Sequence, residues 1–152
     1  MNARVLNENG ERTVVIVFDT GDEVVDGLTR WAKAQRVTGA RFTAIGAFSQ
    51  VVLGYFEWDR KDYKRIRVQE QVEVLSLVGN IALKGSEPTL HAHVVVGKAD
   101  GSAHGGHLLE GLVRPTLEVV VAEAPRELRR RFDPVTGLAL LDAGRHSREG
   151  KP

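Results

Sequence analysis

The chain has 152 residues, of which 42% are hydrophobic and 27% are charged, proportions that suit a single soluble globular domain. Lysine and arginine number 21 against 20 acidic residues, so the large basic excess of a free-standing nucleic-acid-binding protein is missing. The absence of cysteine excludes disulfides, thiolate metal ligands and thiol nucleophiles, and leaves histidine, carboxylates, carbonyls and water as the available ligands.

The N-terminal part of the chain predicts one strand and one helix. The β-branched run at 14–18 is typical of a buried strand. Apolar residues spaced by three and four over 23–35 predict an amphipathic helix, capped by Thr20 or Asp22 and followed by Gly39. The first ten residues lack the apolar segment of a signal peptide, and no apolar run approaches the ~20 residues of a membrane span, so we expect a cytoplasmic protein.

Strands dominate the rest of the chain. Alternating or β-branched patterns predict strands at 40–48, 51–58, 63–68, 72–83, 90–96, 117–121 and 138–141. We expect a loop in the glycine- and histidine-rich segment 101–111, a short helix at 127–132 and a flexible polar tail from 143 on. One N-terminal helix followed by consecutive strands predicts an α+β fold, with the helix packed on a mostly antiparallel sheet. The absence of βαβ alternation argues against a Rossmann-like nucleotide fold.

Histidines form the main functional signal. His91 and His93 alternate on a predicted strand, whose side-chain period of two points both imidazoles to the same face. The glycine-rich segment that follows supplies His104 and His107. We take His91, His93 and His107 as candidate ligands of one transition-metal ion, zinc by preference, because three imidazoles with an open fourth position form a common zinc site. The plainer alternative is a set of hydrogen-bonded structural histidines. His104 and His146 are left out of the site.

The cupin pattern is a second reading of the same histidines. Gly85, five further residues and then His91 and His93 match its beginning. Cupins next place a glutamate ligand four or five residues after the second histidine. Gly97 and Lys98 occupy those positions here, so the cupin reading fails at a ligand.

A broader resemblance rests on segments spread along the chain: Gly79-Asn80, Leu90-His91-Ala92-His93, Gly105-Gly106-His107-Leu108 and Val113-Arg114-Pro115-Thr116-Leu117-Glu118. Together they resemble the PPC domain (plant and prokaryote conserved) family, in its stand-alone prokaryotic type. The resemblance covers about residues 5–142 and leaves 143–152 as a tail. It implies an α+β homotrimer in which the three histidines bind zinc. In plants the domain follows AT-hook motifs in transcription regulators, but this chain has no AT-hook, so DNA binding rests on analogy alone.

Three charged residues are further candidates for the pocket around the metal. Arg114 and Glu118 could pair with each other or orient a histidine, and Glu110 could act as a general base for zinc-bound water. Three functions stay open at this point. They are a zinc site that binds a small molecule or catalyses metal-assisted hydrolysis, a DNA-binding or regulatory module using the basic runs at 60–67 or 126–131, and a trimeric scaffold whose metal only fixes the fold. Whether the protein is an enzyme is left undecided.

Overall fold

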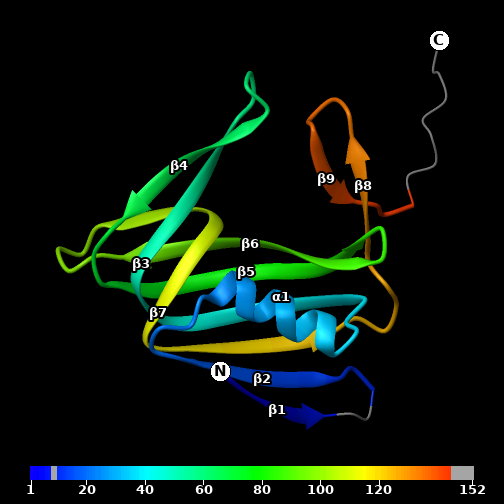
Figure 1. Ribbon diagram of the computed structural model, residues 1–152, viewed down its shortest axis with the longest axis horizontal. Coiled ribbons are helices and arrows are strands. Elements are labelled where there is room, and N and C mark those ends of the chain that lie inside the picture. The colour runs from blue at the N-terminus through cyan, green and yellow to red at the C-terminus, as the bar shows by residue number, and fades with distance from the viewer. Residues whose placement is uncertain (8–9, 145–152) are drawn as a thin grey trace.

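The computed structural model describes residues 1–7 and 10–144, and within them it contains nine strands and one helix (Figure 1). The predicted tail lies outside the described residues from 145 on. In chain order the elements are β1 (Asn2–Asn7), β2 (Thr13–Asp19), α1 (Val24–Ala34), β3 (Gly39–Glu57), β4 (Asp62–Val68), β5 (Val72–Lys84), β6 (Glu87–Gly97), β7 (Ala103–Glu123), β8 (Arg129–Asp133) and β9 (Leu138–Leu141).

The predicted α+β class is wrong, because strands make up 66% of the structure and helix only 8%. All nine strands join one mixed sheet, in which β5 and β8 pair in parallel and the other pairs are antiparallel. The expected loop at 101–111 is largely part of β7, a strand of 21 residues. The expected helix at 127–132 is replaced by β8, because this segment pairs with β5 on one side and β9 on the other. The predicted strands at 40–48 and 51–58 are parts of one strand, β3, the one at 117–121 is the end of β7, and β1 was not predicted. The remaining predicted strands and the helix are confirmed.

Four of the strands close into a ring. β3 pairs with β7, β7 with β6, β6 with β5, and β5 again with β3. The ring closes because β3 and β7 are long enough to change partners along their length. The first half of β3 lies beside β5, and its second half lies beside β4. Register shifts near Gly46 accompany this change of partner, as expected where a strand bends.

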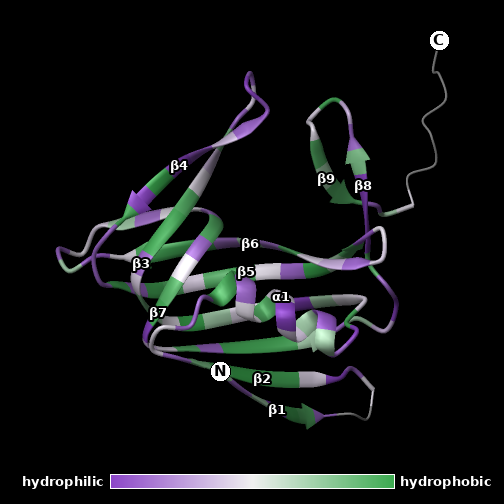
Figure 2. Ribbon diagram, viewed as in Figure 1, coloured by the Kyte–Doolittle hydropathy of each residue, from purple (hydrophilic) through white to green (hydrophobic). Residues whose placement is uncertain are grey.

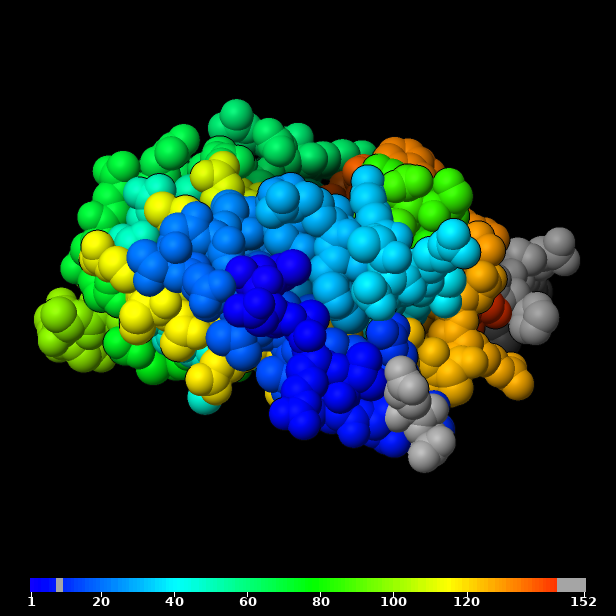
Figure 3. All heavy atoms as spheres, turned by 60° about the horizontal axis from the view of Figure 1, so that its bottom comes forward, coloured from blue at the N-terminus to red at the C-terminus, as the bar shows by residue number. Residues whose placement is uncertain are grey.

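The helix packs on the ring through one apolar side. Val24, Leu28 and Trp31 are buried at helical spacing, and α1 lies against β6 and β7. Its opposite side is open to solvent, as the space-filling view shows (Figure 3). The cap is Glu23 rather than the predicted Thr20 or Asp22, since the Glu23 carboxylate accepts the Asp26 N–H at 2.7 Å. At 11 residues α1 is too short to cross a bilayer, and the described chain contains no other helix.

Two hairpins rise from one side of the sheet, above β5 and β6 (Figure 1). One joins β3 to β4, with a hydrophilic turn, and the other joins β8 to β9 (Figure 2). Their tips meet where the Lys61 ammonium donates to the Pro134 carbonyl oxygen at 3.2 Å. This contact links the turns of the two hairpins.

Candidate metal centre

The three candidate histidines meet on the outer surface of the ring. His91 and His93 lie on β6, and His107 lies on β7 directly opposite His93 in the strand register. The ring centroids are 5.2 Å apart for His91 and His93, 5.1 Å for His91 and His107, and 5.5 Å for His93 and His107. One ligand nitrogen from each residue lies within 4.8 Å of the other two. The structure therefore brings together the trio expected from the sequence.

The alternation of β6 explains why these side chains face outward. Ala92, Val94 and Val96 are buried in the core, so their neighbours His91 and His93 must point to the opposite face of the strand. The burial of the apolar residues of β6 thus fixes the direction in which the two histidines point. A shift of one residue in the pairing would bury the imidazoles and expose the valines, which makes this register strongly specified.

His107 is held by an aromatic ring from the neighbouring hairpin. The Tyr63 ring of β4 stacks on His107 with centroids 4.6 Å apart and planes 23° apart. Gly54 of β3 lies beside His107 in the register and makes room for this ring, because a Cβ at Gly54 would be 2.8 Å from Tyr63 Cδ1. Gly106 serves the same close approach, since a Cβ there would be 2.9 Å from the Gly54 carbonyl oxygen. The glycines expected to form a loop instead allow strands to pack tightly.

Burial favours the neutral, metal-binding form of the imidazoles. Burial, together with smaller contributions from the charges of His91, His93 and Arg130, lowers the pKa of His107 to about 4. Burial also lowers the pKa of His91, and the charges of Arg130 and His93 contribute to this shift to a smaller degree. Metal ligation requires deprotonated nitrogens, so these shifts leave the imidazole nitrogens of His91 and His107 free of protons at neutral pH.

The donor set fits a tetrahedral metal ion. Among the described residues no hydrogen bond holds any of the three rings, and the buried Nδ1 of His107 has no hydrogen-bond partner. This is unlike a set of structural histidines, whose buried nitrogens would be hydrogen-bonded. Nitrogens bound to one tetrahedral zinc ion lie ~3.4 Å apart, so small rotations of the side chains would close the present trio around it.

Sequence reasoning missed Arg130, which reaches the site from β8. Its Nη2 donates to Oδ1 of Asn80, and Asn80 lies opposite His91 in the register of β5 and β6. The residue belongs to the basic run at 126–131, which the sequence offers as a candidate surface for DNA binding. The alternation of a short strand buries Arg130 in part while Arg131 stays exposed. Only the pairing of β8 with β5 reveals this direction, and the sequence carries no signal for that pairing.

The three charged pocket candidates lie on β7 but have other partners. Glu110 forms an ion pair with Arg65 of β4. Arg114 donates from Nε to Gln71 Oε1 at 2.7 Å, and not to Glu118. Glu118 is exposed opposite Ile45 in the β3 register. No hydrogen bond in the described chain links any of them to a histidine, and their roles at the site stay predictions.

Comparison with known proteins identifies relatives of the chain. The family model of the Plants and Prokaryotes Conserved (PCC) domain, also written PPC domain, matches residues 6–125. A putative DNA-binding protein from Bacteroides thetaiotaomicron is 29% identical, with a TM-score of 0.84 over 94% of this chain and 99% of that chain. A metal-containing protein from Archaeoglobus fulgidus is 35% identical, with a TM-score of 0.78 over 85% of this chain and 91% of that chain.

A curated relative is much longer than this chain. The bifunctional protein GlmU of Synechococcus sp. strain JA-3-3Ab is 32% identical over 124 residues, which make up 80% of this chain. The same residues make up only 19% of the relative, so this chain spans about a fifth of its length. The similarity therefore concerns one segment of that protein.

Proposed function

This chain belongs to the Plants and Prokaryotes Conserved (PCC) domain family, and from that premise we propose that it binds one divalent transition-metal ion, zinc first of all, through His91, His93 and His107. The observation that carries the proposal is the meeting of three imidazole nitrogens within 4.8 Å of one another. Neutral imidazoles are preferred zinc ligands, and the chain has no cysteine to offer instead. The solved relative from Archaeoglobus fulgidus, itself described as metal-containing, supports the proposal.

Three protein ligands leave one position on a tetrahedral ion for a small molecule or water. Bound zinc would supply Lewis acidity at that position. The chain's own residues hold the site: the register of β6 and β7 sets His93 opposite His107, and the Tyr63 ring limits rotation of His107. We therefore propose a ligand-binding metal site rather than an ion that only fixes the fold.

Zinc content of tag-free protein tests the proposal, with His93→Ala as the variant and His104→Ala as its matched control. Both side chains are exposed strand residues of the same type, and only His93 belongs to the trio. We expect ~1 zinc per chain in the wild type and in His104→Ala, and a loss of zinc affinity by at least ~100-fold in His93→Ala. Equal zinc content in all three proteins, or none in the wild type, would exclude the trio as a zinc site.

We further propose that the protein assembles as a homotrimer, as the family resemblance implies. An uncovered apolar surface supports self-association, because exposed apolar side chains gather on the outer face of the sheet beside the histidines. This apolar face consists of Ile45, Leu75, Val78, Val95 and Val120. Val78 lies directly opposite His93 in the register, so the face begins at the metal site.

DNA binding is the second candidate function, and one observation favours it: a solved relative is named for it. The basic strand β4 offers Lys64 and Arg67 at the surface, although Arg65 between them is paired with Glu110. Contacts to phosphates would give an affinity that falls steeply with salt concentration. Titration of duplex DNA at low and moderate salt distinguishes this function from a metal site, and absence of binding at low salt would remove it.

A further inference from the structure

Arg130 is a partly buried cation whose counter-charge is missing. Its Nη2 donates to Asn80, and its Nη1 donates to the Ala139 carbonyl oxygen at 3.3 Å. Both acceptors are neutral, and no carboxylate within the described residues forms an ion pair with Arg130. The buried Nε has no hydrogen-bond partner there either. A guanidinium has five N–H donors, so this one keeps three without an acceptor from the described chain.

Burial without a counter-charge is unfavourable for the charged form of Arg130. Burial lowers the pKa of Arg130, because removal from water disfavours the charged form. Arginines buried in proteins are normally paired with an anion, because an uncompensated buried charge is unfavourable. The Arg130 cation therefore lies at a position where the described residues supply no anion to neutralise it.

Arg130 lies at the edge of the histidine site. Asn80, which holds Arg130, is the cross-strand neighbour of His91, and the Arg130 charge is felt by both His91 and His107. A divalent ion on the trio would add a second positive charge close to the first. In a partly desolvated site two such charges repel each other, so Arg130 weakens metal binding unless an anion lies between them.

We propose that the ligand of this site is a small oxyanion, a carboxylate or a phosphate, which places one oxygen at the open position of the metal and another on the guanidinium of Arg130. This inference rests on the proposed metal binding. Planar arginine donors suit carboxylate and phosphate oxygens, and the metal supplies the second anchor. A neutral ligand would leave both cations uncompensated, so the anion is the class that the site selects.

Thermodynamic coupling between the ion and the anion gives the test. The zinc affinity of the wild type is measured against a chromophoric chelator, alone and with acetate or inorganic phosphate as probe, with chloride at matched ionic strength as reference. If the anion bridges both cations, we expect a probe to raise zinc affinity at least ~10-fold, since the two ligands assist each other reciprocally. A rise with acetate alone assigns a carboxylate, and a rise with phosphate alone assigns a phosphate. An equal rise with chloride would overturn the proposal, because it would show that any anion suffices and that the paired oxygens of an oxyanion are not needed.

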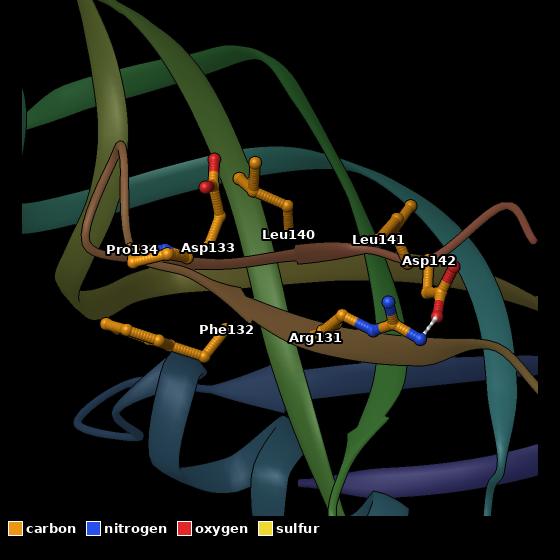
Figure 4. A pocket seen from close by; sticks show the side chains of 7 residues that line it. All are labelled: Arg131, Phe132, Asp133, Pro134, Leu140, Leu141 and Asp142. Atoms are coloured by element: carbon orange, nitrogen blue, oxygen red, sulfur yellow. Dashed lines mark ion pairs between the residues drawn. The ribbon is translucent and has the colours of Figure 1, made fainter. Parts of the chain in front are cut away.

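Arg130→Gln separates this proposal from simple metal chemistry. We expect its zinc affinity without probe to equal or exceed that of the wild type, because a repelling charge is gone, and the rise with probe to shrink to less than ~2-fold. Arg131→Gln is the matched control, since Arg131 lies on the other side of β8, 77% exposed, and pairs with Asp142 at 3.4 Å beside a separate pocket (Figure 4). It should behave as the wild type.

The possible outcomes distinguish a failure of the Arg130 proposal from a failure of the metal-site proposal. Zinc binding with the same probe effect in Arg130→Gln and the wild type would overturn the role of Arg130 and leave the metal site standing. A wild type that binds no zinc would overturn the metal site itself. Should Arg130→Gln not fold, Arg130→Lys keeps the charge and loses the planar donors, so it should retain part of the probe effect. A cobalt-substituted protein gives an independent readout, because its visible absorption should change when the probe enters the coordination sphere.

Discussion

At the scale of single residues, the backbone of the candidate site sets where the three histidines lie, but little in it sets the rotation of their rings. Strand register puts His93 opposite His107, and the Tyr63 ring covers one side of His107. Among the described residues, no hydrogen bond fixes the rotation of the three imidazoles about their side-chain bonds. A bound ion can therefore draw the rings inward without breaking a hydrogen bond, which keeps the cost of metal binding low.

His107 makes the metal-free protein sensitive to acid. Its pKa is about 4 in the folded chain, mainly because of burial, against 6.5 as the ordinary value that we take for the unfolded chain. Between these values the unfolded state binds the proton and the folded state does not. The stabilisation by neutral His107 is therefore complete above about pH 6.5 and is lost as the pH falls toward about 4.

We expect this loss to be smaller in His107→Asn, which keeps a polar side chain and removes the titrating group. Thermal unfolding in the presence of a metal chelator measures it, with both proteins followed from pH 7 to pH 4. The difference in Tm between the wild type and the variant should decrease as the pH falls through this window. A difference that stays constant across the window would show that the folded chain does not disfavour protonated His107.

At the scale of elements, the bend of β3 decides whether the ring can close. Gly46 occupies this bend with φ +146°, a conformation that side chains rarely adopt. A Cβ there would also overlap the carbonyl oxygen of Thr116 on β7 and lie 2.8 Å from Leu117 Cα. Glycine is required here for two reasons: the backbone conformation of residue 46 disfavours a side chain, and the neighbouring strand β7 leaves no room for a Cβ.

Gly46→Ala should therefore cost more stability than a glycine substitution that strains φ alone. Gly85, in the turn between β5 and β6, is the matched control, because it has φ +64° but no atom within 4 Å of a Cβ. Guanidinium unfolding should show a loss of ~1–2 kcal/mol for Gly85→Ala, the cost of the left-handed conformation. For Gly46→Ala we expect ~3 kcal/mol or more, because backbone atoms cannot move aside cheaply. Equal losses would mean that β7 yields to the new methyl group.

The elements also show what the sequence could reveal. Apolar alternation predicted most strands, and the His-x-His spacing on one of them correctly placed His91 and His93 on the same face, because both depend on local periodicity. The segment around His107 was expected to be a loop, since glycine usually marks loops, whereas here Gly105 and Gly106 permit close strand packing. Arg130 was missed for a non-local reason: its direction depends on the pairing of β8 with β5, more than forty residues away in the chain.

At the scale of the whole molecule, the three clustered histidines and the apolar face form one continuous surface. A row of outward side chains crosses neighbouring strands from His107 to His93, Val78, Thr43 and Val120. The inner face of the same strands forms the core, so the outer valines are surplus to folding the single chain. An apolar surface of this kind is typical of a contact between copies, and it would set the metal sites of a trimer next to its subunit boundaries.

Ile45→Glu tests this assembly without touching the histidines. Ile45 is 61% exposed in the middle of the apolar face and lies opposite Glu118, so a second carboxylate would bring like charges together and place them in the interface. Val135→Glu is the matched control, at 64% exposure on the turn between β8 and β9. Light scattering coupled to size exclusion should give three times the 16.7 kDa of one chain for the wild type and for Val135→Glu. Ile45→Glu should appear mainly as single chains that still bind zinc, because every ligand of the proposed site comes from one chain. A wild type that elutes as a monomer would exclude the trimer, and an Ile45→Glu protein that stays trimeric would place the contact on another surface.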